Sequence, residues 1–112
     1  MEKVIRDWKV AIVISPRFGA WWYTWNTQYL ELLFHPKIVE MVEQWKGNEM
    51  TQEWIIDNIW IWISDDESYE YICTLWNGGL TIQWLPEWTK FRVHEYDGSE
   101  SIWTEKDLDL IA

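Results

Sequence analysis

The chain has 112 residues, a formal net charge of −10 and 48% hydrophobic residues, so we expect residues 1–112 to fold as one domain. Its acidity excludes the basic surface on which direct nucleic-acid binding depends, and its apolar runs are too short to cross a membrane. The charged opening at residues 1–3 predicts no signal peptide, and Cys73, the only cysteine, can form no internal disulfide. These features predict a cytoplasmic protein.

In chain order, the first predicted element is a buried strand. Residues 10–14 form a continuous apolar run rich in β-branched side chains, as in strands that are covered on both faces. Ser15 and Pro16 end this strand, and an aromatic loop follows over residues 17–26. Residues 27–34 are ambiguous between a loop and a short helical turn.

Two helices are predicted next. The first begins at Pro36, because proline is favoured in the first turn, and it stops near Gly47. Its apolar side chains recur at the spacing of one helix face: Ile38, Met41, Val42 and Trp45. Thr51 can cap the second helix, which either continues through Ile63 or stops near Asn58 and passes into a short strand.

The last third of the sequence is typical of antiparallel strands joined by tight turns. The predicted strands cover residues 69–76, 80–85, 90–96 and 101–104. The turns between them are rich in Asn, Asp, Gly and Pro, at residues 77–79, 86–88 and 97–98. The predicted fold class is α+β, with two helices packed on a mainly antiparallel β-sheet in a single compact domain.

The aromatic loop is the main candidate for a binding surface. Trp21, Trp22, Tyr23 and Trp25 fall within five positions, and neither a helix nor a strand can bury four such rings on one face. The chain has twelve tryptophans, more than a domain of this size can hide beside its aliphatic residues. We expect several of them at the surface, at a partner interface or against a ligand. Packing of the loop on the sheet is the alternative for any one ring.

A cationic strand supplies the second half of this candidate site. Lys90, Arg92 and His94 fall on one face of a predicted strand with Tyr96, and Arg17 adjoins the aromatic loop. Aromatic rings stack on bases, and guanidinium groups bind phosphates. The candidate ligand-binding residues are Arg17, Trp22, Tyr23, Trp25, Asn26, Arg92 and His94.

The sequence contains no pattern that is typical of catalysis or of a metal site. His35, His94 and Cys73 lack the spacing of metal ligands, and no phosphate loop, dinucleotide fingerprint or nucleophile elbow occurs. His94 and Glu95 face opposite sides of one predicted strand, which does not suit shared acid–base chemistry. We expect a protein that is not an enzyme, with no catalytic residues, no cofactor and no metal.

Two segments resemble a family of small uncharacterised phage and prophage proteins. Residues 14–26 read ISPRFGAWWYTWN and are similar to the opening of that family, and residues 84–100 read WLPEWTKFRVHEYDGSE and are similar to its closing motif. With the predicted helix over residues 32–43, the likeness spans most of the chain. The family has no established activity, so the resemblance implies a phage setting, in the cytoplasm of a bacterial host, rather than a reaction.

This sequence departs from the family by having tryptophan where the family has glycine, most clearly at Trp45 and Trp88. Trp45 stands at a helix end and Trp88 in a proline turn, and both positions favour glycine. Trp76, at the entry to a glycine-rich turn, is a third candidate. One hypothesis is that these codons are UGA, which some bacterial lineages read as glycine and others as tryptophan. Trp25 and Trp84 fit the family motif as they stand.

Three functions are consistent with these patterns. The first is a non-enzymatic phage accessory or counter-defence protein that sequesters a small nucleotide-like signalling molecule through aromatic stacking and Arg–phosphate contacts. The alternative is an acidic inhibitor that mimics nucleic acid and blocks a host defence protein, which the net charge of −10 suggests. The third is a self-assembling phage protein, a homo-oligomer that uses its aromatic patch as the interface.

Overall fold

A computed structural model describes residues 2–18, 21–24, 26–60 and 77–105 of the chain. The strands in this part form two antiparallel sheets, one with the order β1-β2-β3 and one made of β4 and β5. Their bounds are β1 (Ile5–Arg6), β2 (Lys9–Ile14), β3 (Thr81–Pro86), β4 (Phe91–Tyr96) and β5 (Ser99–Thr104). The α-helices are α1 (Glu31–Phe34), α2 (Pro36–Glu43) and α3 (Gln52–Ile59), and the short 3-10 turns are η1 (Gly47–Glu49) and η2 (Asn77–Gly79).

Strand β2 is the centre of the fold. It pairs with β1 on one side and along its whole length with β3 on the other. Successive side chains of a strand point to opposite faces, so Ala11 and Val13 join one hydrophobic cluster while Ile12 and Ile14 join another. All four are buried. The predicted buried central strand is therefore confirmed.

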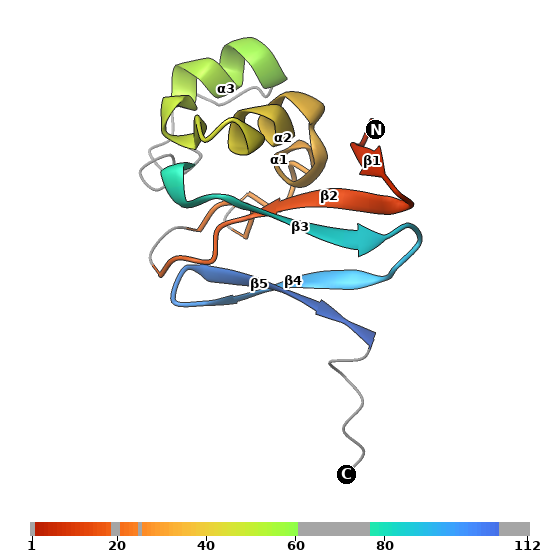
Figure 1. The fold of residues 1–112 in the computed structure, drawn as a ribbon. Coiled ribbons are helices and arrows are strands. Elements are labelled where there is room, and N and C mark those ends of the chain that lie inside the picture. The colour runs from red at the N-terminus through yellow and green to blue at the C-terminus, as the bar shows by residue number, and fades with distance from the viewer. Residues whose placement is uncertain (1, 19–20, 25, 61–76, 106–112) are drawn as a thin grey trace.

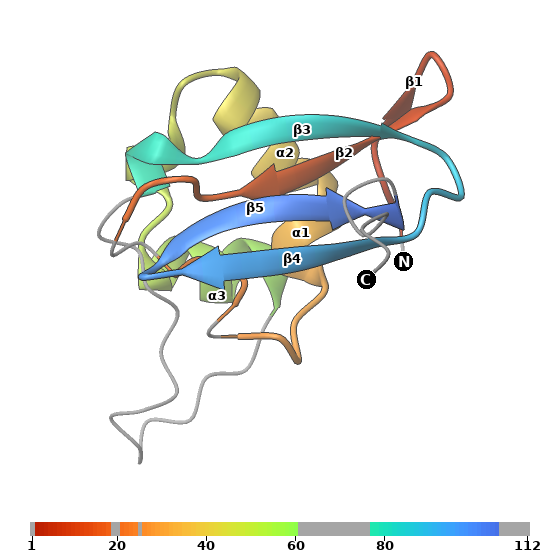
Figure 2. The same cartoon turned by 90° about the horizontal axis from the view of Figure 1, so that it is seen from below.

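The helices and the β4–β5 hairpin lie on opposite sides of the β1–β2–β3 sheet (Figures 1 and 2). The first cluster fills the space between this sheet and the helices, with Leu32 of α1, Ile38 of α2 and Ile55 of α3 at its centre. The second cluster joins the other face of β2 to Phe34 of α1 and Ile102 of β5. Helix α1 therefore contributes to both clusters and connects the two layers.

The predicted helix starts are confirmed by their caps. Helix α2 begins at Pro36, and the ring Nδ1 of His35 accepts the backbone N–H of Lys37 at 3.1 Å. The hydroxyl of Thr51 accepts the backbone N–H of Trp54 at 3.2 Å and caps α3. Helix α3 ends at Ile59, so the shorter of the two predicted lengths is the observed one.

The α+β class and the antiparallel pairing are as predicted, but the arrangement of the elements differs. The strands divide into two sheets: after β3 the chain makes a turn, in which the N–H of Thr89 bonds to the carbonyl of Pro86, and β4 then pairs with β5 instead of β3. Strand β1 and its tight turn were not predicted. Residues 77–79 form a 3-10 turn instead of a hairpin turn. The predicted strand over 69–76 lies outside the described residues.

Candidate ligand groove

One buried carboxylate fixes the aromatic segment to the sheets. Glu100 of β5 is 1% exposed, and one of its carboxylate oxygens accepts the N–H of Ser15 at 3.0 Å. The other oxygen accepts the N–H and the hydroxyl of Thr24, at 2.7 Å and 2.9 Å. Burial raises the pKa of Glu100 above its ordinary value of 4.5, although these hydrogen bonds oppose the rise. The residue next to Thr24, which is Tyr23, is thereby held beside the end of β2.

The aromatic rings of this segment do not share one surface. Trp22 is 1% exposed, and its indole N–H donates to the carbonyl of Leu32 at 2.9 Å. Asn26 is also buried and donates to the carbonyl of Trp22. The structure thus places Trp22 and Asn26 in the core rather than on a ligand surface, because the large indole fills the space between β2 and the helices. Trp25 lies outside the described residues.

Tyr23 stays half-buried and lines a groove of about 460 Å³ between the aromatic segment, α1 and β4. The walls are largely apolar and aromatic, and the lining residues are Tyr23, Thr27, Leu30, Leu33, Phe34, Phe91, Arg92 and Val93. Phe34 and Phe91 meet edge to face, with ring centroids 6.2 Å apart. Small-molecule sites typically have volumes of about 300–1,000 Å³ and apolar walls with a few polar groups, so this groove has the size and lining of a ligand site.

One cation, Arg92, lines this groove, and a second, Lys3, lies over a ring that the groove shares with a neighbouring pocket. Arg92 is exposed and lines the groove, and the ammonium of Lys3 sits 4.5 Å from the centroid of the Phe34 ring. The hydroxyl of Tyr23 donates to the carbonyl of Thr27 at 3.4 Å. Burial, with a smaller effect from the charge of Glu100, raises the pKa of Tyr23 above 10.0, so its phenol is neutral at physiological pH.

The remaining predicted site residues lie apart from the groove. Arg17 packs on Gly79, where an added Cβ would clash with the Arg17 side chain, and it does not line the groove. His94 stacks on Trp103 with ring centroids 4.0 Å apart. Among the candidates that the structure describes, Tyr23 and Arg92 line the groove together, whereas Arg17, Trp22, Asn26 and His94 do not line it.

Sequence reasoning missed the aromatic wall made by Phe34 and Phe91. The alternation along β4 indicated that Phe91 and Val93 share a face, and both are half-buried in the structure. What brings α1 to this face is the pair Leu33 and Phe34 in the second cluster. Neither residue has a local sequence partner that reveals the contact.

No family model, no curated protein and no solved structure matches this chain. In the part of the chain that the structure describes, no three His, Cys, Asp or Glu side chains gather closely enough to hold a metal ion. Within the same residues, none of the helices has the length and apolarity needed to span a bilayer. Any function must therefore be argued from the groove and from the surface itself.

Proposed function

We propose that this chain is a non-enzymatic binding protein of the phage accessory or counter-defence type, and that it sequesters a small nucleotide-like molecule in the groove beside Tyr23. The observation that carries the proposal is the meeting of Tyr23, Phe91 and Arg92 around one groove of about 460 Å³. Tyr23 is far along the chain from the adjacent pair Phe91 and Arg92 of β4, and together the three combine aromatic surface with an exposed cationic side chain.

The chemistry of the groove matches the two parts of a nucleotide. A base that stacks on an aromatic side chain gains about 1–3 kcal/mol, and Tyr23 and the Phe34–Phe91 pair present such surfaces. A guanidinium binds phosphate oxygens through paired, charge-assisted hydrogen bonds, which is the role of Arg92. The protein as a whole carries a charge of −10, so an anionic ligand in the groove needs the local cation Arg92.

Calorimetry with a panel of cyclic and ADP-ribose-type nucleotides tests this proposal. We expect one class of nucleotide to bind, with Arg92→Ala weakening its affinity by about 10- to 100-fold through loss of a charge-assisted hydrogen bond. Tyr23→Ala removes a stacking surface and has a similar effect, whereas Tyr23→Phe keeps the ring and retains binding.

Arg17→Ala is the matched control, because it removes the same charge from a residue that packs on Gly79 outside the groove. We expect its affinity to equal that of the unchanged protein. If no nucleotide of the panel binds, or if the Arg17 and Arg92 variants lose affinity equally, a nucleotide site in this groove is contradicted.

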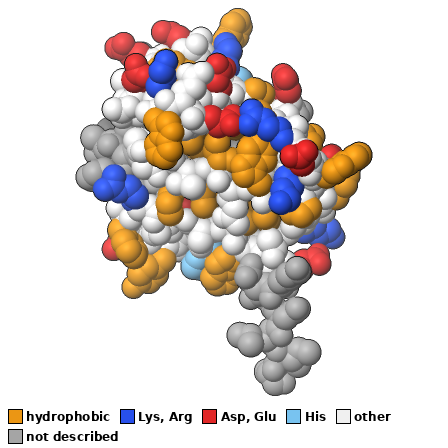
Figure 3. All heavy atoms as spheres, in the orientation of Figure 1, with side chains coloured by type: hydrophobic (Ala, Val, Ile, Leu, Met, Phe, Trp, Pro, Cys, Tyr) orange, Lys and Arg blue, Asp and Glu red, His pale blue; other side chains and the backbone are white. Residues whose placement is uncertain are grey.

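A second candidate function rests on the helical layer. Exposed acidic side chains gather on and between α2 and α3, and they are Glu40, Glu43, Glu49, Glu53 and Asp57. Figure 3 shows Asp and Glu side chains in the upper part of the molecule, where Figure 1 places the helices. Such a surface suits an acidic inhibitor that occupies the nucleic-acid groove of a host defence protein.

Salt dependence separates the two functions. A complex formed through the several charges of the acidic layer weakens steeply as salt screens them, whereas binding in the groove, which combines stacking with the single cation Arg92, weakens less. Replacing Glu49, Glu53 and Asp57 by their amides abolishes capture of a host protein in the first case and leaves nucleotide binding intact in the second. Capture that survives high salt and the amide variant counts against the inhibitor.

A further inference from the structure

The most exposed tryptophans among the described residues share an unusual backbone conformation. Trp8, Trp45, Trp60 and Trp88 are 82% to 95% exposed, and their φ angles are 66°, 61°, 64° and 68°. Side chains other than hydrogen are disfavoured in this left-handed region, where glycine is at ease. Figure 3 shows hydrophobic side chains as separate patches rather than as one continuous surface. These indoles therefore gain little packing in return for backbone strain.

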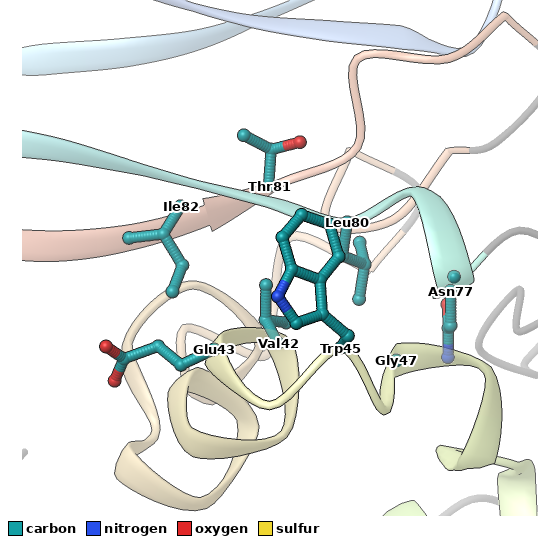
Figure 4. A pocket seen from close by; sticks show the side chains of 9 residues that line it. Val42, Glu43, Trp45, Gly47, Asn77, Leu80, Thr81 and Ile82 are labelled. Carbon is teal, nitrogen blue, oxygen red and sulfur yellow. The ribbon is translucent and has the colours of Figure 1, made fainter.

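Two of the four stand where a helix ends. After α2, the N–H of Lys46 bonds to the carbonyl of Met41 at 2.8 Å, and the N–H of Trp45 bonds to the carbonyl of Val42 at 3.1 Å. This pair of bonds defines a Schellman motif, whose left-handed position is usually glycine, and here it is Trp45. Figure 4 shows its indole beside Val42 and Leu80, at a pocket of about 220 Å³.

Trp60 ends α3 in the related way. Its N–H bonds to the carbonyl of Ile56 at 3.2 Å, which is the single bond of the left-handed helix cap. The conformation again belongs to the residue just past the helix, and glycine is the usual occupant. Both described helices of eight residues therefore end on a tryptophan at the glycine position.

The other two, Trp8 and Trp88, stand in turns, and the turn at Trp8 can be compared with a second turn of the same kind in this chain. Asp97 and Gly98, with φ of 51° and 86°, join β4 to β5. Asp7 and Trp8, with φ of 51° and 66°, join β1 to β2 across an equally short loop. Two-residue hairpin loops with positive φ at both positions favour Asp-Gly. The chain thus makes the same turn twice, once with glycine and once with tryptophan.

Trp88 occupies the third position of the turn after β3. The N–H of Thr89 bonds to the carbonyl of Pro86 at 3.2 Å, which closes a four-residue turn. A positive φ at the third position is the mark of turns that require glycine there. Across the described residues, the non-glycine residues with positive φ are five tryptophans and two aspartates, and both aspartates are at hairpin positions that tolerate Asp.

We propose that Trp8, Trp45, Trp60 and Trp88 are glycines in the protein as its own host makes it, because their codons are UGA and the host reads UGA as glycine. A change in the reading of one codon places tryptophan only where glycine stood, which accounts for strain that falls on a single amino acid. Trp21, with φ of 44°, is the fifth such residue, although it is half-buried and its indole donates to Glu95 at 3.1 Å.

Other tryptophans serve as internal controls, because they are absent from the residues with positive φ and have packing partners. Trp22 is in the core, and Trp54 and Trp84 pack against the first cluster. Trp103 stacks on His94. We expect these four to have UGG codons and therefore to be tryptophan under either reading of UGA. Trp76, a candidate from the sequence, lies outside the described residues.

The coding sequence is the direct test. We expect UGA at positions 8, 21, 45, 60 and 88, and UGG at positions 22, 54, 84 and 103. UGG at positions 8, 45, 60 and 88 overturns the proposal. Peptide mass spectrometry of the protein from its native host is the second test. Glycine in the peptides that cover these positions supports the proposal. Tryptophan there overturns it, even if the codons are UGA.

Single variants supply a third test that needs no host. We expect each of Trp8→Gly, Trp45→Gly, Trp60→Gly and Trp88→Gly to raise the folding equilibrium constant, by about fivefold. Trp84→Gly is the matched control and lowers it, because it removes a packed ring from β3 and places glycine within a strand. A loss of stability in all four exposed variants contradicts the assignment.

None of the four residues lines the groove beside Tyr23, so the nucleotide experiments and these experiments succeed or fail independently. With glycine at the four positions, the largest exposed rings of the described surface disappear. The homo-oligomer that the tryptophan excess suggests then loses those rings as an interface. Light scattering of the unchanged protein and of the fourfold glycine variant measures this difference.

Discussion

Replacing Trp8, Trp45, Trp60 and Trp88 together by glycine should make this protein more stable. A residue with a Cβ at positive φ costs about 1 kcal/mol relative to glycine, after the greater freedom of glycine in the unfolded chain is included. The four side chains are at least 82% exposed, so their removal uncovers little buried surface. The free energy of unfolding should rise by roughly 3–4 kcal/mol in total. This is slightly less than the sum for four independent sites, because the N–H of Glu87 bonds to the carbonyl of Trp8 and couples two of the turns.

Urea denaturation followed by far-ultraviolet circular dichroism measures this change as a shift of the midpoint at constant slope. In a thermal scan it corresponds to a rise of roughly 12–15 °C for a domain of this length. Trp22→Gly is the opposite control and should cost about 3–5 kcal/mol, because it empties the core beside β2. A fourfold variant that is no more stable than the starting protein would refute the claim that these positions are strained.

Two further predictions concern pH. Burial, and then the charge of Lys37, lowers the pKa of His35 from 6.5. As the pH falls, the unfolded chain therefore takes up a proton first, and stability is lost below pH 6.5. His35→Asn retains an acceptor for the N–H of Lys37 and should flatten that loss in urea titrations at several pH values. Burial raises the pKa of Glu100 above 4.5. As the pH rises, the unfolded carboxyl therefore ionises first, and stability falls between pH 4.5 and the raised pKa. Glu100→Gln should abolish this fall, and an unchanged dependence of stability on pH in the variant would contradict the prediction.

Most elements with a strong local signal could be predicted from the sequence. The apolar run of β2, the proline at the start of α2 and the hydroxyl cap of α3 each act within a few residues, and each is found where expected. Strand β1 is two residues long and has no pattern of its own. The division into two sheets depends on how the turn after β3 directs the chain, which residue types alone do not specify.

The candidate site was predictable only in part. The alternation along β4 correctly indicated that Arg92 lies on an exposed face, and Tyr23 was correctly expected near a surface. Trp22 could not be separated from Tyr23 by sequence, because its burial depends on packing against β2 and the helices, where the carbonyl of Leu32 accepts its indole N–H. The wall formed by Phe34 and Phe91 depends on contact between α1 and β4, which have no sequence signal in common.

The three hydrogen bonds at Glu100 have a consequence for any survey of variants. One side chain joins Ser15, Thr24 and strand β5, which are up to 85 residues apart in the chain. Its loss releases the loop that carries Tyr23 while leaving the groove-lining side chains themselves unaltered. On the proposed function, a genetic screen for ligand capture would score Glu100 beside Arg92, although Glu100 does not line the groove, and only a measurement of folding would tell the two kinds of lesion apart.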